Sequence, residues 1–149
     1  MKIALGSDHR GFKYKELIKK ILEARRIGFE DFGTFSEDSA DYPDFGIKAA
    51  EAVALGLANA GIIICGSGNG IAISANKVKG IRAVIATNAE MARLGRAHND
   101  ANVLALSEMF TPEQEIEKIV ETFLNTGFDG GRHARRVDKI KKYEQGINK

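Results

Sequence analysis

The sequence predicts an α/β protein, a three-layer Rossmann- or flavodoxin-like sandwich with a five-stranded parallel sheet and a C-terminal helix. The first observation is that short apolar runs alternate along the chain with segments of helical periodicity, a pattern typical of β-α-β units. The second is the run Gly61-Ile62-Ile63-Ile64-Cys65, which is apolar at every position. Such a run indicates a central parallel strand that helices cover on both faces.

Length and composition bound the class of protein. A chain of 149 residues, 44% hydrophobic and 28% charged, is typical of one soluble domain, expected here over residues 1–149. No apolar run approaches the ~20 residues that cross a bilayer, and the N-terminal apolar run ends too early for a secretory signal. The single cysteine excludes an intramolecular disulfide and fits a reducing compartment. We therefore expect a cytoplasmic protein without a membrane partner.

The expected strands and the first helices have clear local signals. Apolar residues at helical spacing over 14–22 indicate the first helix, and Pro43 suits the first turn of the second. A third helix follows the glycines after Cys65 and runs through Lys77. The expected strands cover residues 2–6, 29–32, 61–65, 82–86 and 102–106.

Two later helices carry capping signals. Residues 87–90 match a capping box in which Thr87 caps the helix, with Met91 on the apolar face. Residues 111–114 combine a threonine cap with Pro112 at the first helical position. A last helix is expected to start near Arg132.

Polar and glycine-rich residues gather directly after two of the predicted strands. Ser7-Asp8-His9 follows the first strand, and Cys65-Gly66-Ser67-Gly68-Asn69-Gly70 follows the third. Ligands of open α/β sheets bind outside the carboxyl ends of the strands, near the point where the strand order reverses. The sequence therefore predicts a ligand site at this edge of the sheet.

The glycines of segment 65–70 suit an anion site. Gly66, Gly68 and Gly70 allow successive backbone N–H groups to turn toward one point, and the helix that follows adds its positive end. The same surroundings favour the thiolate form of a cysteine, so Cys65 is a candidate catalytic residue. The alternative is a small inert side chain at the end of a buried strand. The position of Cys65 at the mouth of the loop favours the functional interpretation.

Nucleotide binding is the weaker alternative for this loop. The dinucleotide fingerprint needs G-x-G-x-x-G in the first β-α turn, whereas these glycines follow the third strand and Ile71 stands where the third glycine belongs. The chain also lacks the Gly-Lys-Ser/Thr of a P-loop.

The three histidines, His9, His98 and His133, all lie in polar junctions. Metal binding by a histidine cluster is an alternative, but no H-x-x-x-H or C-x-x-C spacing supports it, and we expect no metal. Simpler structural roles also remain open. Asp8 suits a helix N-cap, and His98-Asn99-Asp100 suits a turn-forming surface loop.

The C-terminal segment is basic. Residues 132–149 carry a net charge of +5, whereas the whole chain carries +2. Arg132 and Arg136 are four residues apart, hence on one face of a helix, and two guanidinium groups match a phosphate dianion. The alternative is a solvated basic helix. Nucleic-acid binding would need more basic and aromatic residues than the segment has, and we expect no nucleic-acid partner.

Six segments spread in order over the whole chain carry a family pattern: Ser7-Asp8-His9-x-Gly11-Phe12, Asp41-Tyr42-Pro43, Cys65-Gly66-Ser67-Gly68-x-Gly70, Gly80-Ile81-Arg82-Ala83, His98-Asn99-Asp100-x-Asn102-Val103-Leu104 and Gly130-Gly131-Arg132-His133-x-x-Arg136. Together they resemble ribose-5-phosphate isomerase type B. The resemblance implies interconversion of D-ribose 5-phosphate and D-ribulose 5-phosphate through an enediolate in the pentose phosphate pathway, with no metal or organic cofactor. It also implies a homodimer, sometimes a tetramer, whose active sites are shared between subunits.

The resemblance also implies roles for individual residues. Cys65 matches the base that moves the proton between C2 and C1, and Ser67 matches the residue that serves the enediol oxygens. His98 together with Asp8 matches the pair that opens the furanose ring. Phosphate ligands are implied at His9, Arg132 and Arg136, and substrate contacts at Tyr42 and Asn99, with the loop residues Gly66, Gly68, Asn69 and Gly70 completing the expected site.

Alternatives remain open for the sugar and for the activity. Many members of this family have an arginine just after the fifth strand that helps hold the phosphate, whereas this chain has Met109. Galactose-6-phosphate isomerase subunits share much of the pattern. A hexose phosphate, allose 6-phosphate or galactose 6-phosphate, is therefore the second candidate substrate, and a phosphosugar-binding module without catalytic activity is the third candidate function.

Overall fold

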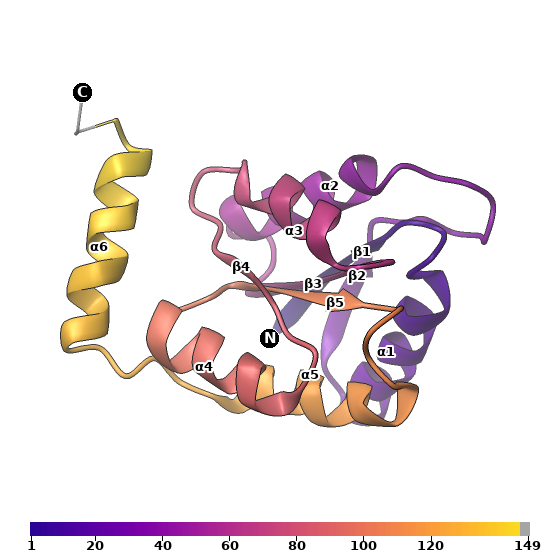
Figure 1. Ribbon diagram of the computed structural model, residues 1–149. Coiled ribbons are helices and arrows are strands. Elements are labelled where there is room, and N and C mark those ends of the chain that lie inside the picture. The colour runs from indigo at the N-terminus through magenta and orange to yellow at the C-terminus, as the bar shows by residue number, and fades with distance from the viewer. Residues whose placement is uncertain (147–149) are drawn as a thin grey trace.

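The computed structural model describes residues 1–146 and contains the expected sheet of five parallel strands (Figure 1). The strands are paired in the order β2-β1-β3-β5-β4. All four pairings are parallel, so the carboxyl ends of all strands lie at one edge. Their bounds are β1 Lys2–Ser7, β2 Gly28–Asp31, β3 Ala60–Cys65, β4 Ala83–Ile85 and β5 Val103–Ser107.

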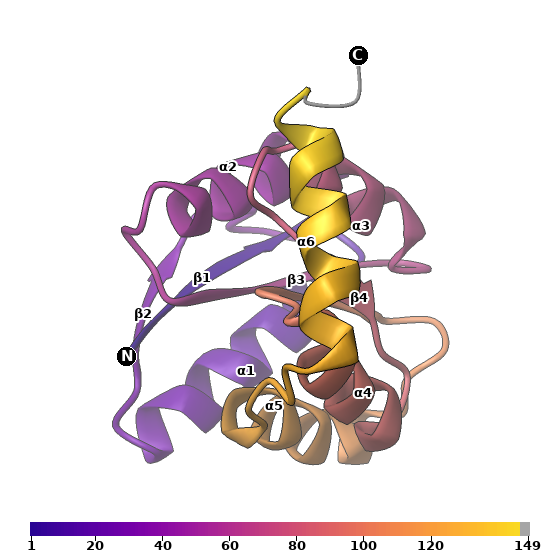
Figure 2. The same cartoon turned by 90° about the vertical axis from the view of Figure 1, so that its left-hand side faces the viewer.

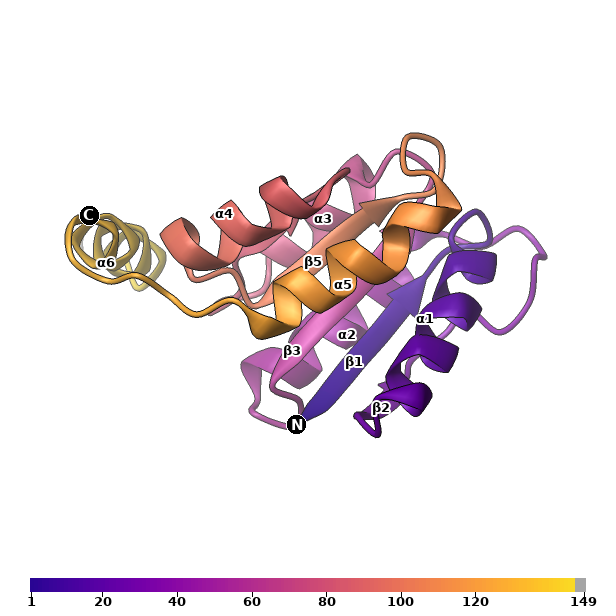
Figure 3. The same ribbon diagram turned by 90° about the horizontal axis from the view of Figure 1, so that it is seen from below.

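Helices cover both faces of the sheet, which confirms the three-layer sandwich. One layer holds α1 (Phe12–Ala24), α4 (Ala89–Asn99) and α5 (Ile116–Asn125), and the other holds α2 (Tyr42–Ala54) and α3 (Asn69–Asn76), as Figures 1 and 3 show. None of the described helices is long and apolar enough to cross a membrane.

Strand β3 supplies side chains to both halves of the core. Successive residues of a strand point to opposite faces, so Ile62 and Ile64 pack under α1 and α5, whereas Ile63 and Cys65 pack under α2 and α3. All four are buried. The apolar run that predicts a doubly covered strand therefore corresponds to the central element of the fold.

The structure corrects both predicted capping motifs. Asn88, not Thr87, caps α4, because its Oδ1 accepts the Met91 N–H at 2.8 Å, and the Met91 side chain is exposed. Thr111 caps no helix: its hydroxyl is buried without a hydrogen bond among the described residues. The backbone of Pro112 is extended, and a short 3-10 helix, Glu113–Glu115, precedes α5.

Helix α6 (Arg132–Glu144) begins where the last helix is expected but stands apart from the sandwich at the left of Figure 1, and it faces the viewer in Figure 2. Only Val137 of this helix is buried, while Ile140 and Tyr143 are more than half exposed. It contacts α4, and the Glu144 carboxylate accepts the Gly80 N–H at 2.9 Å. Gly80 precedes β4, so α6 lies at the amino edge of the sheet.

A buried lysine ties α1 to the carboxyl end of β2. The Lys15 side chain is fully buried, and its Nζ lies 2.5 Å from Asp31 Oδ2. The other carboxylate oxygen of Asp31 accepts the Gly33 N–H at 2.9 Å, which anchors the loop over residues 32–41. Burial opposes ionisation of Asp31, but the hydrogen bonds from Lys15 and Gly33 outweigh it and hold its pKa below the ordinary value.

We expect Asp31→Asn to lower the free energy of unfolding by about 3 kcal/mol, because the substitution leaves the buried Lys15 ammonium with only the half-exposed Glu16 as counter-ion. Urea denaturation at neutral pH measures the change. Glu16→Gln is the matched control and should cost under about 1 kcal/mol, because Glu16 is a half-exposed partner of the same lysine. Equal stability of Asp31→Asn and the wild type would contradict the account.

The contribution of the Lys15–Asp31 pair to the free energy of unfolding should depend on pH. Asp31 has a lowered pKa in the folded state, so its stabilising contribution is complete above the ordinary carboxyl pKa and is lost as the pH falls through the lowered value. The stability difference between wild type and Asp31→Asn should stay constant down to about pH 4 and shrink below it.

Candidate active site

The predicted edge carries the first group of candidate residues. The strand order reverses between β1 and β3, and Asp8 and His9 follow β1 while the glycine loop follows β3. The chain after β5 closes the group: the N–H groups of Glu108 and Met109 donate to the carbonyls of Cys65 and Gly66 at 3.0 and 2.9 Å. The glycine loop is therefore held between the ends of two neighbouring strands.

The local backbone geometry explains why positions 68 and 70 of the loop are glycine. Gly68 has a φ of +84° and directly precedes α3, in a conformation that side chains disfavour. At Gly70 an added Cβ would lie 2.6 Å from Cε1 of Tyr42, the first residue of α2. The Tyr42 ring thus packs against the loop, and the Ser67 hydroxyl accepts the Asn69 N–H at 3.2 Å. Tyr42, Ser67 and Asn69 are thus gathered after the end of β3, the strand whose last residue is Cys65.

Cys65 ends β3, and its side chain is 3% exposed. A thiol in this position is shielded from bulk water yet adjoins the loop whose backbone N–H groups suit an anion. This arrangement can move a proton on a bound substrate while fixed dipoles stabilise the negative charge that develops.

Asp8 is held by the turn it belongs to. Its carboxylate accepts the Gly11 N–H at 3.0 Å, and its own N–H donates to Ile64 O at 3.3 Å. An added Cβ at Gly11 would lie 2.5 Å from that same carbonyl oxygen, so the turn packs closely on β3. The structure corrects the helix N-cap expected at Asp8: Gly11 is the N-cap of α1, and no side chain caps this helix. The Asp8 carboxylate instead stabilises the turn before α1 and lies beside β3, the strand that leads into the glycine loop.

His9 is oriented by the loop over residues 32–41. Its Nδ1 lies 3.1 Å from the Ala40 nitrogen and 3.2 Å from the Ala40 oxygen, so it accepts the Ala40 N–H in one tautomer and donates to the Ala40 carbonyl in the other. When Nδ1 accepts this hydrogen bond, the ring proton sits on Nε2, which is then a donor suited to an anion. The Lys15–Asp31 pair anchors the start of the same loop.

The second group of predicted residues lies at the opposite edge of the sheet. His98 and Asn99 form the last turn of α4, not a loop, and Arg132 and Arg136 lie on α6. Helix α4 contacts α6 at this edge, away from the carboxyl ends of β1 and β3 (Figure 1). His98 therefore lies beside His133 of α6 and is separated from Cys65 and Asp8. Within one chain, then, the predicted site residues form two separate groups.

His98 and His133 stack at this second edge. Their ring centroids are 4.1 Å apart with an angle of 8° between the planes. Burial lowers the pKa of His133, and the nearby positive charges of His98, Arg132 and Arg136 lower it further, against the opposing effect of Asp129.

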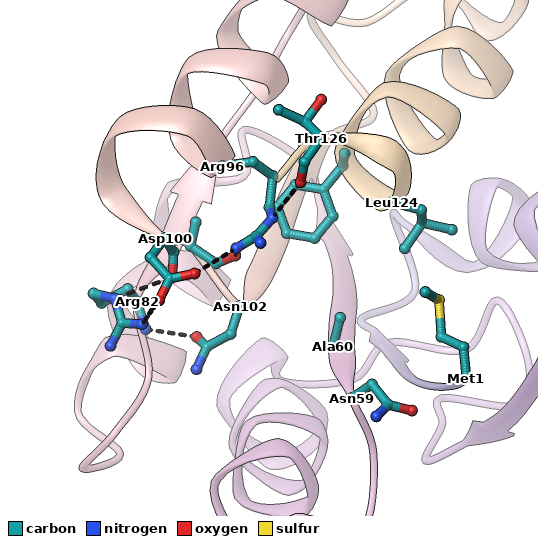
Figure 4. Close-up of a pocket in the computed structure, with 11 residues that line it drawn as sticks. Met1, Asn59, Ala60, Arg82, Arg96, Asp100, Asn102, Leu124 and Thr126 are labelled. Atoms are coloured by element: carbon teal, nitrogen blue, oxygen red, sulfur yellow. Dashed lines mark hydrogen bonds and ion pairs between the residues drawn. The ribbon is translucent and has the colours of Figure 1, made fainter. Parts of the chain in front are cut away.

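Two arginines brace the end of α4 at a polar pocket of about 320 Å³ (Figure 4). Arg96 donates to the carbonyls of Thr126 and Ala101 and pairs with Asp100 at 3.0 Å. Arg82 donates to the Asp100 carbonyl at 2.8 Å. Because backbone carbonyls occupy both guanidinium groups, this pocket fixes the position of the His98 turn rather than offering a free anion site.

Two charged residues beside the glycine loop, Arg10 and Glu108, are not among the residues predicted from the sequence. Arg10 Nη2 lies 3.6 Å from Glu108 Oε2, and the Arg10 stem passes about 4 Å from where a Cβ on Gly66 would lie. They line a pocket of about 210 Å³ together with His9, Lys13 and Glu37. The signal available was that Arg10 directly follows Asp8-His9 at the end of β1.

Comparison with known proteins agrees with this geometry. The model of the family described as Ribose/Galactose Isomerase matches residues 3–140, and the chain belongs to this family. Among individual relatives, the Escherichia coli protein named ribose-5-phosphate isomerase B is 44% identical over 147 residues, covering 99% of each chain. The Clostridium thermocellum ribose-5-phosphate isomerase B structure has a TM-score of 0.96 and 52% identity, covering 99% of each chain.

One further solved structure bears on the ligand. It is ribose-5-phosphate isomerase B from Mycoplasma genitalium with bound ribulose 5-phosphate, 41% identical with a TM-score of 0.93. The match covers 97% of this chain and 96% of that one. The expected fold class and family are thereby confirmed.

Proposed function

We propose that this chain interconverts D-ribose 5-phosphate and D-ribulose 5-phosphate, with Cys65 as the base, in the cytoplasmic pentose phosphate pathway. The observation that carries the proposal is the position of Cys65, at the end of a central strand and beside the glycine loop. The bound ribulose 5-phosphate in the M. genitalium relative supports the choice of substrate.

The chemistry follows from this position. On the open-chain aldose, the Cys65 thiolate removes the proton from C2, and negative charge moves to the oxygen on C1. The loop N–H groups and the Ser67 hydroxyl stabilise the resulting enediolate. The hydroxyl proton on O2 then passes to O1, which moves the negative charge to O2. The thiol returns its proton to C1, and the product has a hydroxyl on C1 and a carbonyl at C2. One base placed near both carbons and a set of fixed donors suffice for this step.

The separation of the two residue groups supports a homodimer with shared sites. A complete site needs His98, Asn99, Arg132 and Arg136 beside Cys65, and these lie at opposite edges of one chain. A two-fold axis brings opposite edges of two copies together twice, so that two sites form. In each, the partner subunit's His98 would open the sugar ring with Asp8, and the partner subunit's Arg132 and Arg136 would bind the phosphate.

Arg10 offers a phosphate contact from the same subunit as Cys65. It lines one pocket with His9, and Glu108 is its present counter-ion. A phosphate dianion in this pocket would replace Glu108 as the partner of Arg10. The matching position after β5 is Met109, so we propose that Arg10 supplies the positive charge on this side.

The first test is Cys65→Ala. Without a base, turnover of ribose 5-phosphate should fall by at least about 10³-fold, while substrate still protects the protein against thermal unfolding. Lys20→Ala, a change at an exposed position of α1, is the control and should retain activity. Normal turnover by Cys65→Ala would refute the role of the base, and activity lost together with substrate binding would not support it.

A mixed dimer tests the shared sites. A Cys65→Ala chain and a His98→Ala/Arg132→Ala chain carry different affinity tags, and the doubly tagged dimer is purified. It should contain one intact site and one site that carries every substitution, and therefore about half the wild-type turnover per dimer. Each parent homodimer should be almost inactive. A mixed dimer as inactive as its parents would show that each site is built within one chain.

Variants of Arg10 and Glu108 should change KM in opposite directions. Arg10→Ala should raise KM about ten-fold with little change in kcat, since it removes a charge-assisted contact made throughout the reaction. Glu108→Gln should lower KM, because Arg10 loses its competing partner. Lys13→Ala is the control with a smaller effect, since that side chain is 78% exposed. Steady-state kinetics on ribose 5-phosphate measures all three, and an unchanged KM for Arg10→Ala would remove Arg10 from the site.

A further inference from the structure

The fold brings together three potential metal ligands that lie apart in the sequence. His98 belongs to the last turn of α4, Asp129 to the segment before α6, and His133 to the first turn of α6. One ligand atom of each residue lies within 4.8 Å of those of the other two, and His98 Nε2 is 4.0 Å from Asp129 Oδ2. The Asp129 N–H donates to Ala97 O at 3.0 Å, which holds its backbone against α4.

We propose that His98, Asp129 and His133 bind a divalent transition-metal ion such as Zn²⁺, and that the bound ion inhibits the isomerase. Two imidazole nitrogens and one carboxylate oxygen form a ligand set that Zn²⁺ accepts, with a fourth position left for water. Hard ions such as Mg²⁺ prefer oxygen ligands and waters, so this set discriminates against them.

Binding requires a small rearrangement of side chains only. Zn–N and Zn–O bonds of about 2.1 Å place tetrahedral ligand atoms roughly 3.4 Å apart, so the present cluster must contract by about 1 Å. The ring nitrogens of two stacked imidazoles point in parallel directions, so one ring must also turn about its side-chain bonds. His98 and Asp129 are 39% and 59% exposed, which leaves them room to do so.

The charges around the cluster set its selectivity and strength. Asp129 contributes one negative charge, while Arg132 and Arg136 lie close enough to act on His133. These arginines repel a cation, and ions that prefer oxygen ligands bind imidazole too weakly to offset this repulsion. An ion that bonds strongly to imidazole can overcome the repulsion, and the site is therefore a regulatory or inhibitory one rather than a structural zinc site.

The inhibition rests on the proposed role of His98 in opening the sugar ring. A ring nitrogen bound to Zn²⁺ can neither accept nor donate a proton. The ion would also hold His133 between Arg132 and Arg136 and so restrict the helix turn that presents both arginines. Zn²⁺ binding itself does not depend on the catalytic proposal.

Direct binding is tested by titration of Zn²⁺ against a chromophoric chelator in phosphate-free buffer, with Cys65→Ala as the parent chain so that the thiol cannot contribute. The parent should bind one Zn²⁺ per chain and no Mg²⁺. Adding Asp129→Asn or His133→Gln should weaken binding at least about ten-fold. Adding His9→Gln, which alters the histidine outside the cluster, should leave it unchanged. Unaltered affinity in the first two variants, or loss in the third, would overturn the site.

Activity is measured separately on chains that keep Cys65. Wild-type turnover should fall with added Zn²⁺ and return with EDTA, while Asp129→Asn and His133→Gln should stay active and resist Zn²⁺ by the same factor as their loss of affinity. Equal sensitivity of these variants would overturn the inhibition, as would binding without inhibition. A chain that binds Zn²⁺ as predicted but never isomerises ribose 5-phosphate would refute the proposed function and leave the metal site standing.

Discussion

Burial of β3 on both faces is the constraint on which the rest of the structure depends. A strand whose every side chain is buried has no free face on which to display a polar group. Its chemistry can appear only where it ends, and Cys65 is the last residue of β3. Because all strands are parallel, the same edge receives Asp8 and His9 from β1 and the Glu108-Met109 turn from β5. The candidate site lies at this edge because helices cover both faces of the sheet.

This constraint also explains which parts of the site could be predicted from sequence. Strand number, the helix layers and the gathering of Asp8, His9 and segment 65–70 all follow from apolar pattern and parallel topology. The separation of His98 from Cys65 follows from the same topology, since a helix after a parallel strand runs back and ends at the amino edge. When the motifs are treated as one site, the sequence does not show that His98 and Cys65 lie at opposite edges of one chain.

The exact helix starts and the burial of Lys15 were harder to predict, because neighbouring residues offer equally good alternatives or because the partner comes from another element. Thr87 and Asn88 are both capable caps, and only the observed start of α4 selects Asn88. Thr111 precedes a proline in the extended conformation, so the chain enters α5 through a 3-10 turn instead. Lys15 lies on an amphipathic helix where a lysine normally faces solvent; its burial depends on Asp31, contributed by a different element. Nothing in the spacing along the chain reveals such a pair.

Helix α6 shows how loosely one part of a chain can be attached to its own core. With a single buried residue, Val137, it contributes little to the packing of the subunit that carries it. Substitutions at its exposed positions should therefore cost the subunit little folding stability, and what they change is the surface that α6 offers to a ligand or a second chain. If the sites are shared between subunits as we propose, one copy of a duplicated gene could keep the glycine loop while the other kept the arginines of α6. Neither chain alone could then form a complete active site, and only the association of the two different chains would restore one.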